Sequence, residues 1–308
     1  MRIDEILTTP SPCFSFEFFP PKTDEGQRSL EGALGELKKD SPDYVSVTYG
    51  AAGSTRERTV EVTKWIKQDL GVEAMAHLSC VGEPVDRLRE ILDEVAAAGV
   101  ENVLALRGDP PRGEADWKPH PKGLESSVEL IELIRARYDL CIGATCFPEV
   151  HPEAAGLEHD LRYTKQKVDA GASFLITQLF FENEDYFRFV ERAREFGIDV
   201  PIIAGIMPIT NFEQVKRFTT MCGASIPPAL FEQLEARHQE EGDEAVTELG
   251  VAYATLQCAD LLERGAPGIH FYTLNKSPAT RAILSALKAW QPRERGRASA
   301  PAPLHQAS

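Results

Sequence analysis

Residues 73–80 read EAMAHLSC, residues 85–99 read VDRLREILDEVAAAG and residues 102–109 read NVLALRGD. The outer two stretches are short and apolar, which is typical of strands that are covered on both faces. In the middle stretch, apolar residues from Val85 to Val95 recur at the spacing of one helical face, and Gly99 stands where helices commonly end in a left-handed turn. The order strand, helix, glycine, strand predicts two parallel strands joined by a helix.

The same unit recurs along the chain. The predicted strands are Cys13–Pro20, Tyr44–Gly50, Glu73–Cys80, Asn102–Asp109, Cys141–Pro148, Phe174–Phe181, Pro201–Pro208 and Gly268–Asn275. A count of eight, with no glycine-rich phosphate loop after the first strand, favours a closed barrel over an open sheet. We therefore predict an α/β fold, a single (β/α)8 TIM barrel.

The connection between the seventh and eighth strands is too long for one helix. We expect a short helix near 211–220, a second near 229–239 and a long helix near 244–264, and we expect this connection to cover the site. Residues 1–290 would form the catalytic barrel, whereas the Ala/Pro/Ser-rich tail of residues 291–308 is expected to be disordered.

Composition narrows the function classes. The formal charge is -15 over 308 residues, which disfavours nucleic acid and anionic membranes as partners. No long apolar run and no secretory signal are present, so we expect a cytoplasmic protein. The six cysteines show no Cys-x-x-Cys pair, which favours reduced, mostly buried thiols over a zinc site.

The rim formed by the strand ends is the expected active site of such a barrel. Glu17 lies among aromatic residues, which predicts a raised pKa and suits a general acid. The alternative is a structural ion pair between Glu17 and Arg107. These two readings carry equal weight on the sequence alone.

Other strand ends carry polar side chains. Gly108 permits close approach of a ligand to the backbone, and the neighbouring Asp109 can bind a ring N–H, although an ordinary turn would look the same. His77 and His151 end or follow two further strands. They fit a shared ligand or a metal equally well.

Further candidates have plain structural alternatives. Thr48 and Tyr49 end the second strand, and the amide of Gln178 fits recognition of a heteroaromatic edge but could pair with a loop. Phe212 could stack on a ligand or cap a helix. Asp160 and Lys167 share one helical face, for which a solvated surface pair is the default.

Several stretches together resemble the methylenetetrahydrofolate reductase family. They are Ser15–Pro21, Val47–Ala51, Leu106–Asp109, Pro148–Ala154, Thr177–Gln178 and His270–Asn275. Each motif alone is weak, but they occur in the family's order over nearly the whole chain.

The resemblance implies an FAD enzyme that takes hydride from NADH or NADPH and passes it to 5,10-methylenetetrahydrofolate, in one-carbon metabolism and methionine supply. It implies that Glu17 is the general acid and that Asp109 binds the pterin and influences the flavin. The implied FAD contacts are Thr48, Tyr49, Ala51, His77, Arg107, Gly108, Asp109, Phe147, His151, Ala154, Asp160 and Lys167, and the implied substrate contacts are Gln178, Phe212 and Lys276. No metal is implied, and we expect a homo-oligomer.

The chain departs from the family pattern at four places. Phe147 stands where the family often has Tyr, Tyr163 and Gln166 replace the Asn and Arg of some members, and Lys276 stands where many members have Arg. The first three affect the expected FAD contacts. The last keeps the charge but loses the bidentate fork of a guanidinium.

Three other functions remain open at this stage. A proline-dehydrogenase-like barrel would also bind FAD, and a barrel of this kind could act only as a binding subunit in a redox complex. A metal-dependent hydrolase could use His77, His151 and Asp109.

Overall fold

The computed structural model describes residues 1–21, 23–49, 56–108, 120–276 and 278–289. Two predicted site residues, Ala51 and Asp109, lie outside the described residues, as does the predicted tail of residues 291–308. None of the helices in the described part of the chain has both the length and the apolar character needed to cross a membrane.

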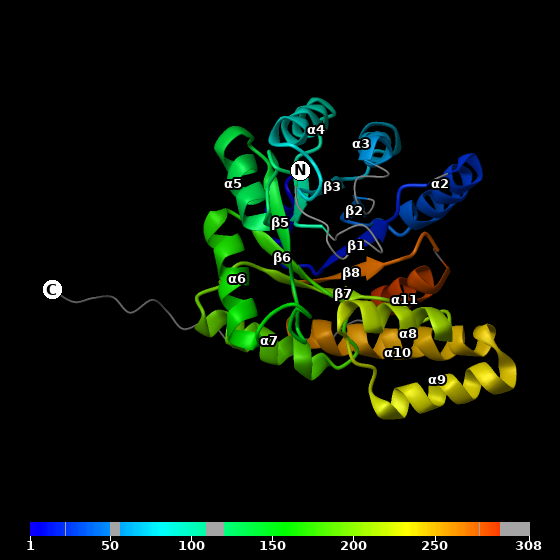
Figure 1. Cartoon of the computed structure of the whole chain (residues 1–308). Helices are drawn as coiled ribbons and strands as arrows, with labels where there is room; N and C mark the ends of the chain where they lie inside the picture. Colours follow the sequence, from blue (N-terminus) through cyan, green and yellow to red (C-terminus); the bar gives the residue numbers. More distant parts are fainter. Residues whose placement is uncertain (22, 50–55, 109–119, 277, 290–308) are drawn as a thin grey trace.

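Eight parallel strands in the described part of the chain close into a barrel in sequence order (Figure 1). They are β1 (Cys13–Phe18), β2 (Tyr44–Val47), β3 (Ala74–Ser79), β4 (Asn102–Leu106), β5 (Cys141–Cys146), β6 (Phe174–Thr177), β7 (Ile202–Ile206) and β8 (Gly268–Tyr272). Pairing of β1 with β8, with Cys13 opposite Gly268 and Glu17 opposite Tyr272, closes the barrel. The predicted TIM-barrel fold is confirmed.

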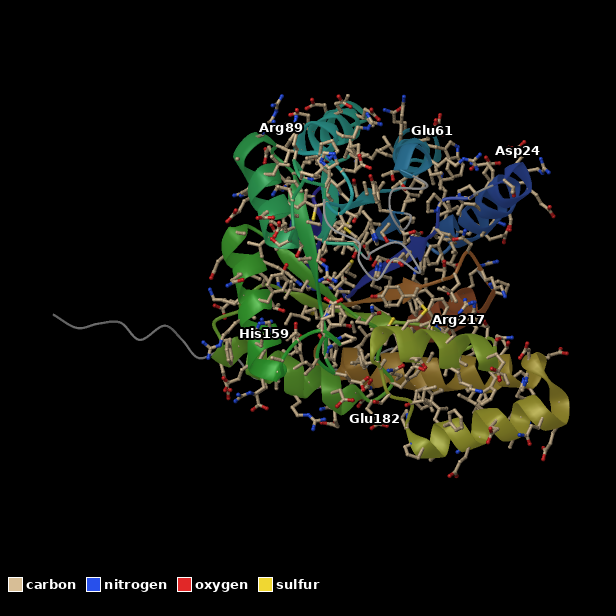
Figure 2. All side chains as sticks on the ribbon, in the orientation of Figure 1. Asp24, Glu61, Arg89, His159, Glu182 and Arg217 are labelled. Carbon is tan, nitrogen blue, oxygen red and sulfur yellow. The ribbon has the colours of Figure 1, made fainter. Side chains whose placement is uncertain are left out.

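The short helix α1 (Ile3–Ile6) precedes β1 and packs against the barrel interior. The other helices follow the strands and form the outer layer. They are α2 (Asp24–Lys38), α3 (Arg56–Trp65) with its π-helical continuation η2 (Ile66–Leu70), α4 (Val85–Ala97), α5 (Ser127–Arg137), α6 (Leu157–Ala170), α7 (Asn183–Glu195), α8 (Phe212–Cys222), α9 (Pro228–Glu241), α10 (Asp243–Glu263) and α11 (Pro278–Ala289). Charged side chains such as Asp24 and Glu61 lie on the outer faces of these helices (Figure 2).

Local sequence explains where several helices begin and end. The Thr23 hydroxyl accepts the Gly26 N–H at the start of α2, and Ser126 caps α5 in the same way. After α4 the chain turns at Gly99, whose φ of 75° lies in the left-handed region.

The three helices expected between the last two strands are present as α8, α9 and α10. In Figure 1 they lie along one side of the barrel, and α9 packs against both α8 and α10. The extra helices of the seventh connection are therefore confirmed.

The predicted strands start within one residue of the observed ones but end too late. The run Phe174–Phe181, for example, continues past the end of β6 at Thr177. Leu179, Phe180 and Phe181 are buried in the following loop, so apolar character persists after the ladder hydrogen bonds stop. Apolarity alone therefore does not mark the end of a strand.

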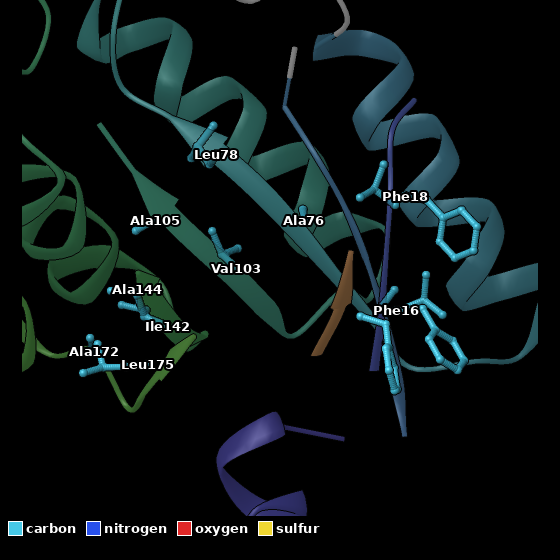
Figure 3. Close-up of a cluster of buried hydrophobic side chains, with 14 of the residues drawn as sticks. Phe16, Phe18, Ala76, Leu78, Val103, Ala105, Ile142, Ala144, Ala172 and Leu175 are labelled. Atoms are coloured by element: carbon cyan, nitrogen blue, oxygen red, sulfur yellow. The ribbon is translucent and has the colours of Figure 1, made fainter. Parts of the chain in front are cut away.

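Two of the three apolar clusters in the described part of the chain hold the barrel strands together. The larger one lies between strands and helices and includes Phe16, Phe18 and Val103 (Figure 3). The smaller one fills the barrel interior near the amino ends of the strands, where Ile3 and Ile6 of α1 pack on Tyr44 and Met75. Because side chains alternate along a strand, Phe16 and Phe18 face the helices while Ser15 and Glu17 face the interior.

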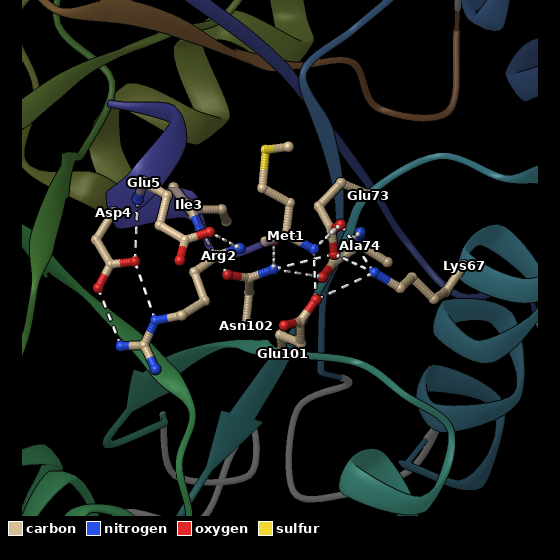
Figure 4. A network of polar contacts seen from close by, with 10 residues as sticks. All are labelled: Met1, Arg2, Ile3, Asp4, Glu5, Lys67, Glu73, Ala74, Glu101 and Asn102. Carbon is tan, nitrogen blue, oxygen red and sulfur yellow. Dashed lines mark hydrogen bonds and ion pairs between the residues drawn. The ribbon is translucent and has the colours of Figure 1, made fainter. Parts of the chain in front are cut away.

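The amino ends of the strands are closed by a polar network (Figure 4). The Met1 amino group contacts Glu101 and lies 2.6 Å from Glu73 Oε2, and Lys67 also binds Glu73. The buried Ile3 N–H donates to Asn102 Oδ1 at 2.8 Å. This closure leaves the carboxyl ends of the strands as the open end of the barrel.

Candidate functional site

A cavity of about 630 Å³ lies at the carboxyl ends of the strands. This volume is within the usual range for small-molecule and cofactor sites. The predicted site residues that line it are Glu17, Thr48, Tyr49, His77, Arg107, Gly108, Phe147, His151, Ala154, Asp160, Lys167 and Gln178. Residues that lie in or after the strands β1 to β6, together with residues of α6, thus meet in one place.

Two predicted substrate residues do not line this cavity. Phe212 is buried in the helical layer of the seventh connection, with its ring centroid 5.4 Å from that of Phe231 and 5.3 Å from that of His238. Lys276 is exposed beyond the end of β8. From the seventh connection, α8 contributes Phe218 and Cys222 to the cavity instead.

Glu17 lies at the floor of the cavity in a network of inward-facing side chains. Its Oε2 is 3.4 Å from His270 Nε2 and 3.6 Å from His77 Nε2. On the far side of the His270 ring, Nδ1 is 2.7 Å from the Ser15 hydroxyl. In the tautomer with its proton on Nε2, His270 accepts from Ser15 and donates to Glu17.

The network changes the acidity of Glu17. Burial disfavours the charged carboxylate, but the hydrogen bond from His270 and the charges that His77 and His270 carry when protonated outweigh it, so the pKa lies below its ordinary value. The predicted raised pKa is wrong for the free protein. The reason is that the partner histidines come from β3 and β8, which meet β1 only in the folded barrel.

The alternative ion pair between Glu17 and Arg107 is also wrong. Arg107 instead forms a bidentate pair with Glu153, with Nη1–Oε2 and Nη2–Oε1 distances of 2.6 and 3.1 Å. Both side chains line the cavity. The guanidinium is therefore held at the cavity wall and already binds one planar anion, the geometry in which Arg recognises carboxylates and phosphates.

Gly108 follows Arg107 with a φ of 88°. A Cβ atom added at this position would lie 1.9 Å from Ser79 Oγ. The backbone at this strand end is therefore both left-handed and in close contact with β3, and only glycine fits it without movement.

Two buried polar atoms of cavity-lining residues have no hydrogen-bond partner among the described residues. They are Thr48 Oγ1 and His77 Nε2, although His77 Nε2 lies 3.6 Å from Glu17 Oε2. Burial lowers the pKa of His77 to about 4, so its ring is neutral at neutral pH. Because buried polar groups are normally paired, these atoms are suited to bind a ligand.

The loop after β5 carries two ring-bearing candidates. The rings of Phe147 and His151 meet edge to face with centroids 4.5 Å apart. The backbone N–H of His151 donates to Asp160 Oδ2 at 3.0 Å, and this hydrogen bond connects the loop to α6. Asp160 thereby fixes the position of His151.

The spacing of Asp160 and Lys167 had suggested a solvated surface pair, and this prediction is wrong. Both are buried because this face of α6 turns toward the strand ends. The Lys167 ammonium donates to the Thr145 carbonyl at 2.8 Å and lies 4.9 Å from the centroid of the Tyr163 ring. Burial lowers the pKa of Lys167 to about 8.

Gln178 lines the cavity just after β6. Its Oε1 accepts the Leu179 N–H at 2.9 Å, the loop pairing that was the structural alternative. Its amide NH2 group makes no hydrogen bond with the residues that the structure describes, so it can still donate to a ligand.

The sequence-based assignment missed several cavity or network residues. His270 and Ser15 have a visible signal, since each lies two residues before another inward-facing residue on its strand. Tyr163, noted only as a departure, lies between Asp160 and Lys167 on one helical face and lines the cavity, whereas Gln166 is exposed. Phe19 has a similar signal, since it lies two residues after Glu17, whereas Glu153 had none.

The described residues hold no group of three His, Cys, Asp or Glu side chains arranged to bind a metal ion. The cavity offers the enclosed Glu17 carboxyl, buried groups without a hydrogen-bond partner among the described residues, and two cations, Lys167 and the Glu153-paired Arg107. This set suits a large, partly anionic, hydrogen-bonding ligand.

Comparisons with known proteins point to one family. The family model described as methylenetetrahydrofolate reductase matches residues 2–288. A Salmonella typhimurium protein named 5,10-methylenetetrahydrofolate reductase is 40% identical over 277 residues, which cover 89% of this chain and 90% of that protein. The Escherichia coli protein of the same name is 39% identical, with the same coverage.

Longer relatives match as well. Methylenetetrahydrofolate reductase (NADH) 1 from Arabidopsis thaliana is 37% identical over 93% of this chain but only 50% of its own length. This chain thus spans about half the length of the plant relatives that it matches.

A solved structure supports the fold. It is described as an uncharacterized protein from Clostridium thermocellum that binds two copies of 5-methyl-5,6,7,8-tetrahydrofolic acid, and it aligns with a TM-score of 0.63 at 17% identity over 94% of this chain and 98% of that one. At that identity the likeness concerns the barrel alone. The family-model match and the bacterial relatives show that this chain belongs to the methylenetetrahydrofolate reductase family.

Proposed function

We propose that this chain reduces 5,10-methylenetetrahydrofolate to 5-methyltetrahydrofolate with FAD as cofactor and NADH or NADPH as electron donor, in two half-reactions. The observation that carries the proposal is the enclosed Glu17 carboxyl at the floor of a cavity lined by cations and unpaired buried polar groups. The names of the bacterial relatives supply the substrate. Family membership favours this function over the proline-oxidising and metal-hydrolase alternatives.

The cavity residues fit a bound FAD in their chemistry. Thr48 Oγ1 and His77 Nε2 need hydrogen-bond partners, and Gly108 keeps one wall free of a side chain. Arg107 and Lys167 supply the positive charge that a pyrophosphate requires. The residues proposed to hold FAD are Thr48, Tyr49, Ala51, His77, Arg107, Gly108, Asp109, Phe147, His151, Ala154, Asp160 and Lys167.

When bound, FAD would store the hydride between the two half-reactions. The protein's part in the first half-reaction is to bind and orient the nicotinamide, for which Gln178 offers an amide beside the cavity. The same amide would contact the folate in the second half-reaction.

In the second half-reaction Glu17 would protonate the folate at the five-membered ring, so that the ring opens to an iminium that accepts hydride. Glu17 must then carry a proton, although its pKa is low in the free protein. A ligand that covers the cavity excludes water and so buries the Glu17 carboxyl further. Stronger burial raises the pKa of Glu17. His270 lies behind Glu17 and is positioned to return the proton between turnovers.

Asp109 is proposed to bind the pterin, and Phe212 and Lys276 to contact the exchanging substrates. The Phe212 ring would have to leave its contacts with Phe231 and His238 to do so. Lys276 is free to reach a flexible anionic part of a substrate, since it is exposed at the end of β8.

An anaerobic titration tests this proposal. The purified chain is loaded with FAD, the flavin absorbance is recorded while NADH or NADPH is added, and methylenetetrahydrofolate follows. Bleaching and then recovery of the flavin spectrum is the expected result, and the more effective nicotinamide identifies the donor. A chain that retains no FAD, or whose bleached flavin does not respond to the folate, would refute the proposal.

A further inference from the structure

We propose that Asn275 is a positioning residue that holds Phe19 and Leu274 in place as the cavity wall beside Glu17. This inference rests on the proposed function for its substrate. The Phe19 N–H donates to Asn275 Oδ1 at 2.7 Å, and Asn275 Nδ2 donates to the Phe19 carbonyl at 2.9 Å. One side-chain amide thus satisfies both backbone groups of Phe19.

The amide continues the pairing of two strands that have already ended. β1 ends at Phe18 and β8 ends at Tyr272. Beyond that point, the Thr273 hydroxyl donates to the Glu17 carbonyl at 2.6 Å, and the Asn275 amide then binds Phe19. The loop after β8 is therefore attached to Glu17 and to the residue two positions after it.

This attachment matters for the site because residues two apart in extended chain share a face. Phe19 lines the cavity as Glu17 does, and Leu274 and Tyr272 line it from the other loop. Phe19 is 42% exposed although it is a large apolar residue. An aromatic ring exposed at a cavity wall is a surface on which a flat heteroaromatic ligand can stack.

The backbone of the loop indicates that the amide is needed. Leu274 and Asn275 have φ values of 51° and 60°, so two consecutive non-glycine residues adopt left-handed conformations. Such conformations persist where surrounding contacts impose them, and they gather at functional sites. Glycine at position 275 would remove the strain of that residue but also both hydrogen bonds to Phe19.

The two hydrogen bonds between the Asn275 amide and Phe19 form a clamp, and the position of this clamp in the barrel predicts which ligand it helps to bind. The cationic group of Arg107 follows β4 and that of Lys167 lies on α6, whereas Asn275 and Phe19 follow β8 and β1 beside the proposed acid. Loss of the clamp should therefore weaken binding of the substrate that Glu17 protonates and leave FAD binding unchanged.

Hydrogen exchange on the FAD-loaded enzyme tests the contact directly. Pro20 and Pro21 have no N–H group, and the first two residues of a peptide do not retain label, so a peptide that spans residues 17–21 reports on the Phe19 amide alone. In Asn275→Gly this amide should exchange roughly tenfold faster, as expected for loss of one ordinary hydrogen bond. In Asn275→Asp, which keeps the acceptor, it should remain protected.

Steady-state kinetics test the role. Asn275→Gly should raise the KM for methylenetetrahydrofolate roughly tenfold, with kcat within about twofold and FAD content unchanged, and Asn275→Asp should recover part of the loss. The control is Asn183→Gly, which removes an amide that binds the Gln257 carbonyl and Asp260 away from the cavity. Asn183→Gly should leave both the exchange rate of the Phe19 amide hydrogen and the KM for methylenetetrahydrofolate unchanged.

Two results would overturn the inference. One is faster exchange of the Phe19 amide in Asn275→Gly without any change in the folate KM. The other is unchanged exchange, which would show that the amide contact is not made. Failure of the proposed function would look different, since the wild-type enzyme would then show no folate turnover while the exchange experiment would still report on the clamp.

Discussion

Replacing Glu17 by glutamine tests the proposed acid most directly. The side chain is 13% exposed and nearly enclosed, so an isosteric change leaves no cavity behind. The amide oxygen can still accept from His270 at the present 3.4 Å. We therefore expect the free energy of unfolding of Glu17→Gln to stay within about 1 kcal/mol of wild type.

The rate effect should be large and confined to one half-reaction. Loss of a general acid typically lowers a rate by about 10²- to 10⁴-fold, or about 3–5 kcal/mol in the activation free energy. Only reduction of methylenetetrahydrofolate needs a proton from Glu17. Reduction of FAD by NADH or NADPH should therefore keep its wild-type rate within a few fold.

Stopped-flow absorbance at the flavin band measures the two half-reactions separately. Glu61→Gln, an exposed carboxyl on α3, serves as the control for a change of one charge and should match wild type in both (Figure 2). Equal losses in the two half-reactions of Glu17→Gln would mean that Glu17 acts through FAD binding or structure. The assignment as acid would then be refuted.

Three further changes test the electrostatics and packing of the site. His77 has a pKa of about 4 against an ordinary 6.5, so the stability that its neutral ring provides is complete above pH 6.5 and is lost as the pH falls toward 4. In urea titrations, His77→Gln should therefore lose about 2 kcal/mol less unfolding free energy than wild type between pH 7 and pH 5. An unchanged pH dependence would contradict this. Lys167 has a pKa of about 8 against 10.5, so its buried charge destabilises the free protein progressively as the pH falls from 10.5 to about 8, and fully below that pH. Lys167→Met should stabilise the apoprotein by about 1–3 kcal/mol at pH 7 while weakening FAD binding in a fluorescence titration, and tighter FAD binding would oppose the assignment. Gly108→Ala should lower the unfolding free energy by about 2–4 kcal/mol because its Cβ meets Ser79 Oγ, and Ser79→Ala should restore part of that loss.

Much of the site was predictable because position in a barrel constrains function. Polar residues at the carboxyl ends of strands converge in this fold, and twelve of the predicted residues do line one cavity. The motif order from Ser15 to Asn275 identified the family before any geometry was known. Phe212 shows the limit of this reasoning, since nearness to a strand end does not say whether a ring faces the cavity or the neighbouring helices.

Electrostatic properties were the least predictable. The local sequence around Glu17 is aromatic and indicates a raised pKa, yet His270 lies 253 positions away and reverses the direction. Helical spacing places Asp160 and Lys167 on one face but does not say which way that face turns. Both errors arise because a pKa depends on every group within a few ångströms, whatever its distance along the chain.

The barrel, the extra helices of its seventh connection and the family could all be predicted from the amino-acid sequence, because apolar periodicity, glycine placement and ordered motifs are local properties. In contrast, the pairing of Arg107 with Glu153, the burial of Lys167 and the contact of Asn275 with Phe19 depend on how the elements pack in the folded chain. These contacts require closure of the barrel, which brings β8 beside β1 and turns α6 toward the strand ends. The chemical character of the rim is therefore a property of the closed barrel and not of any one strand.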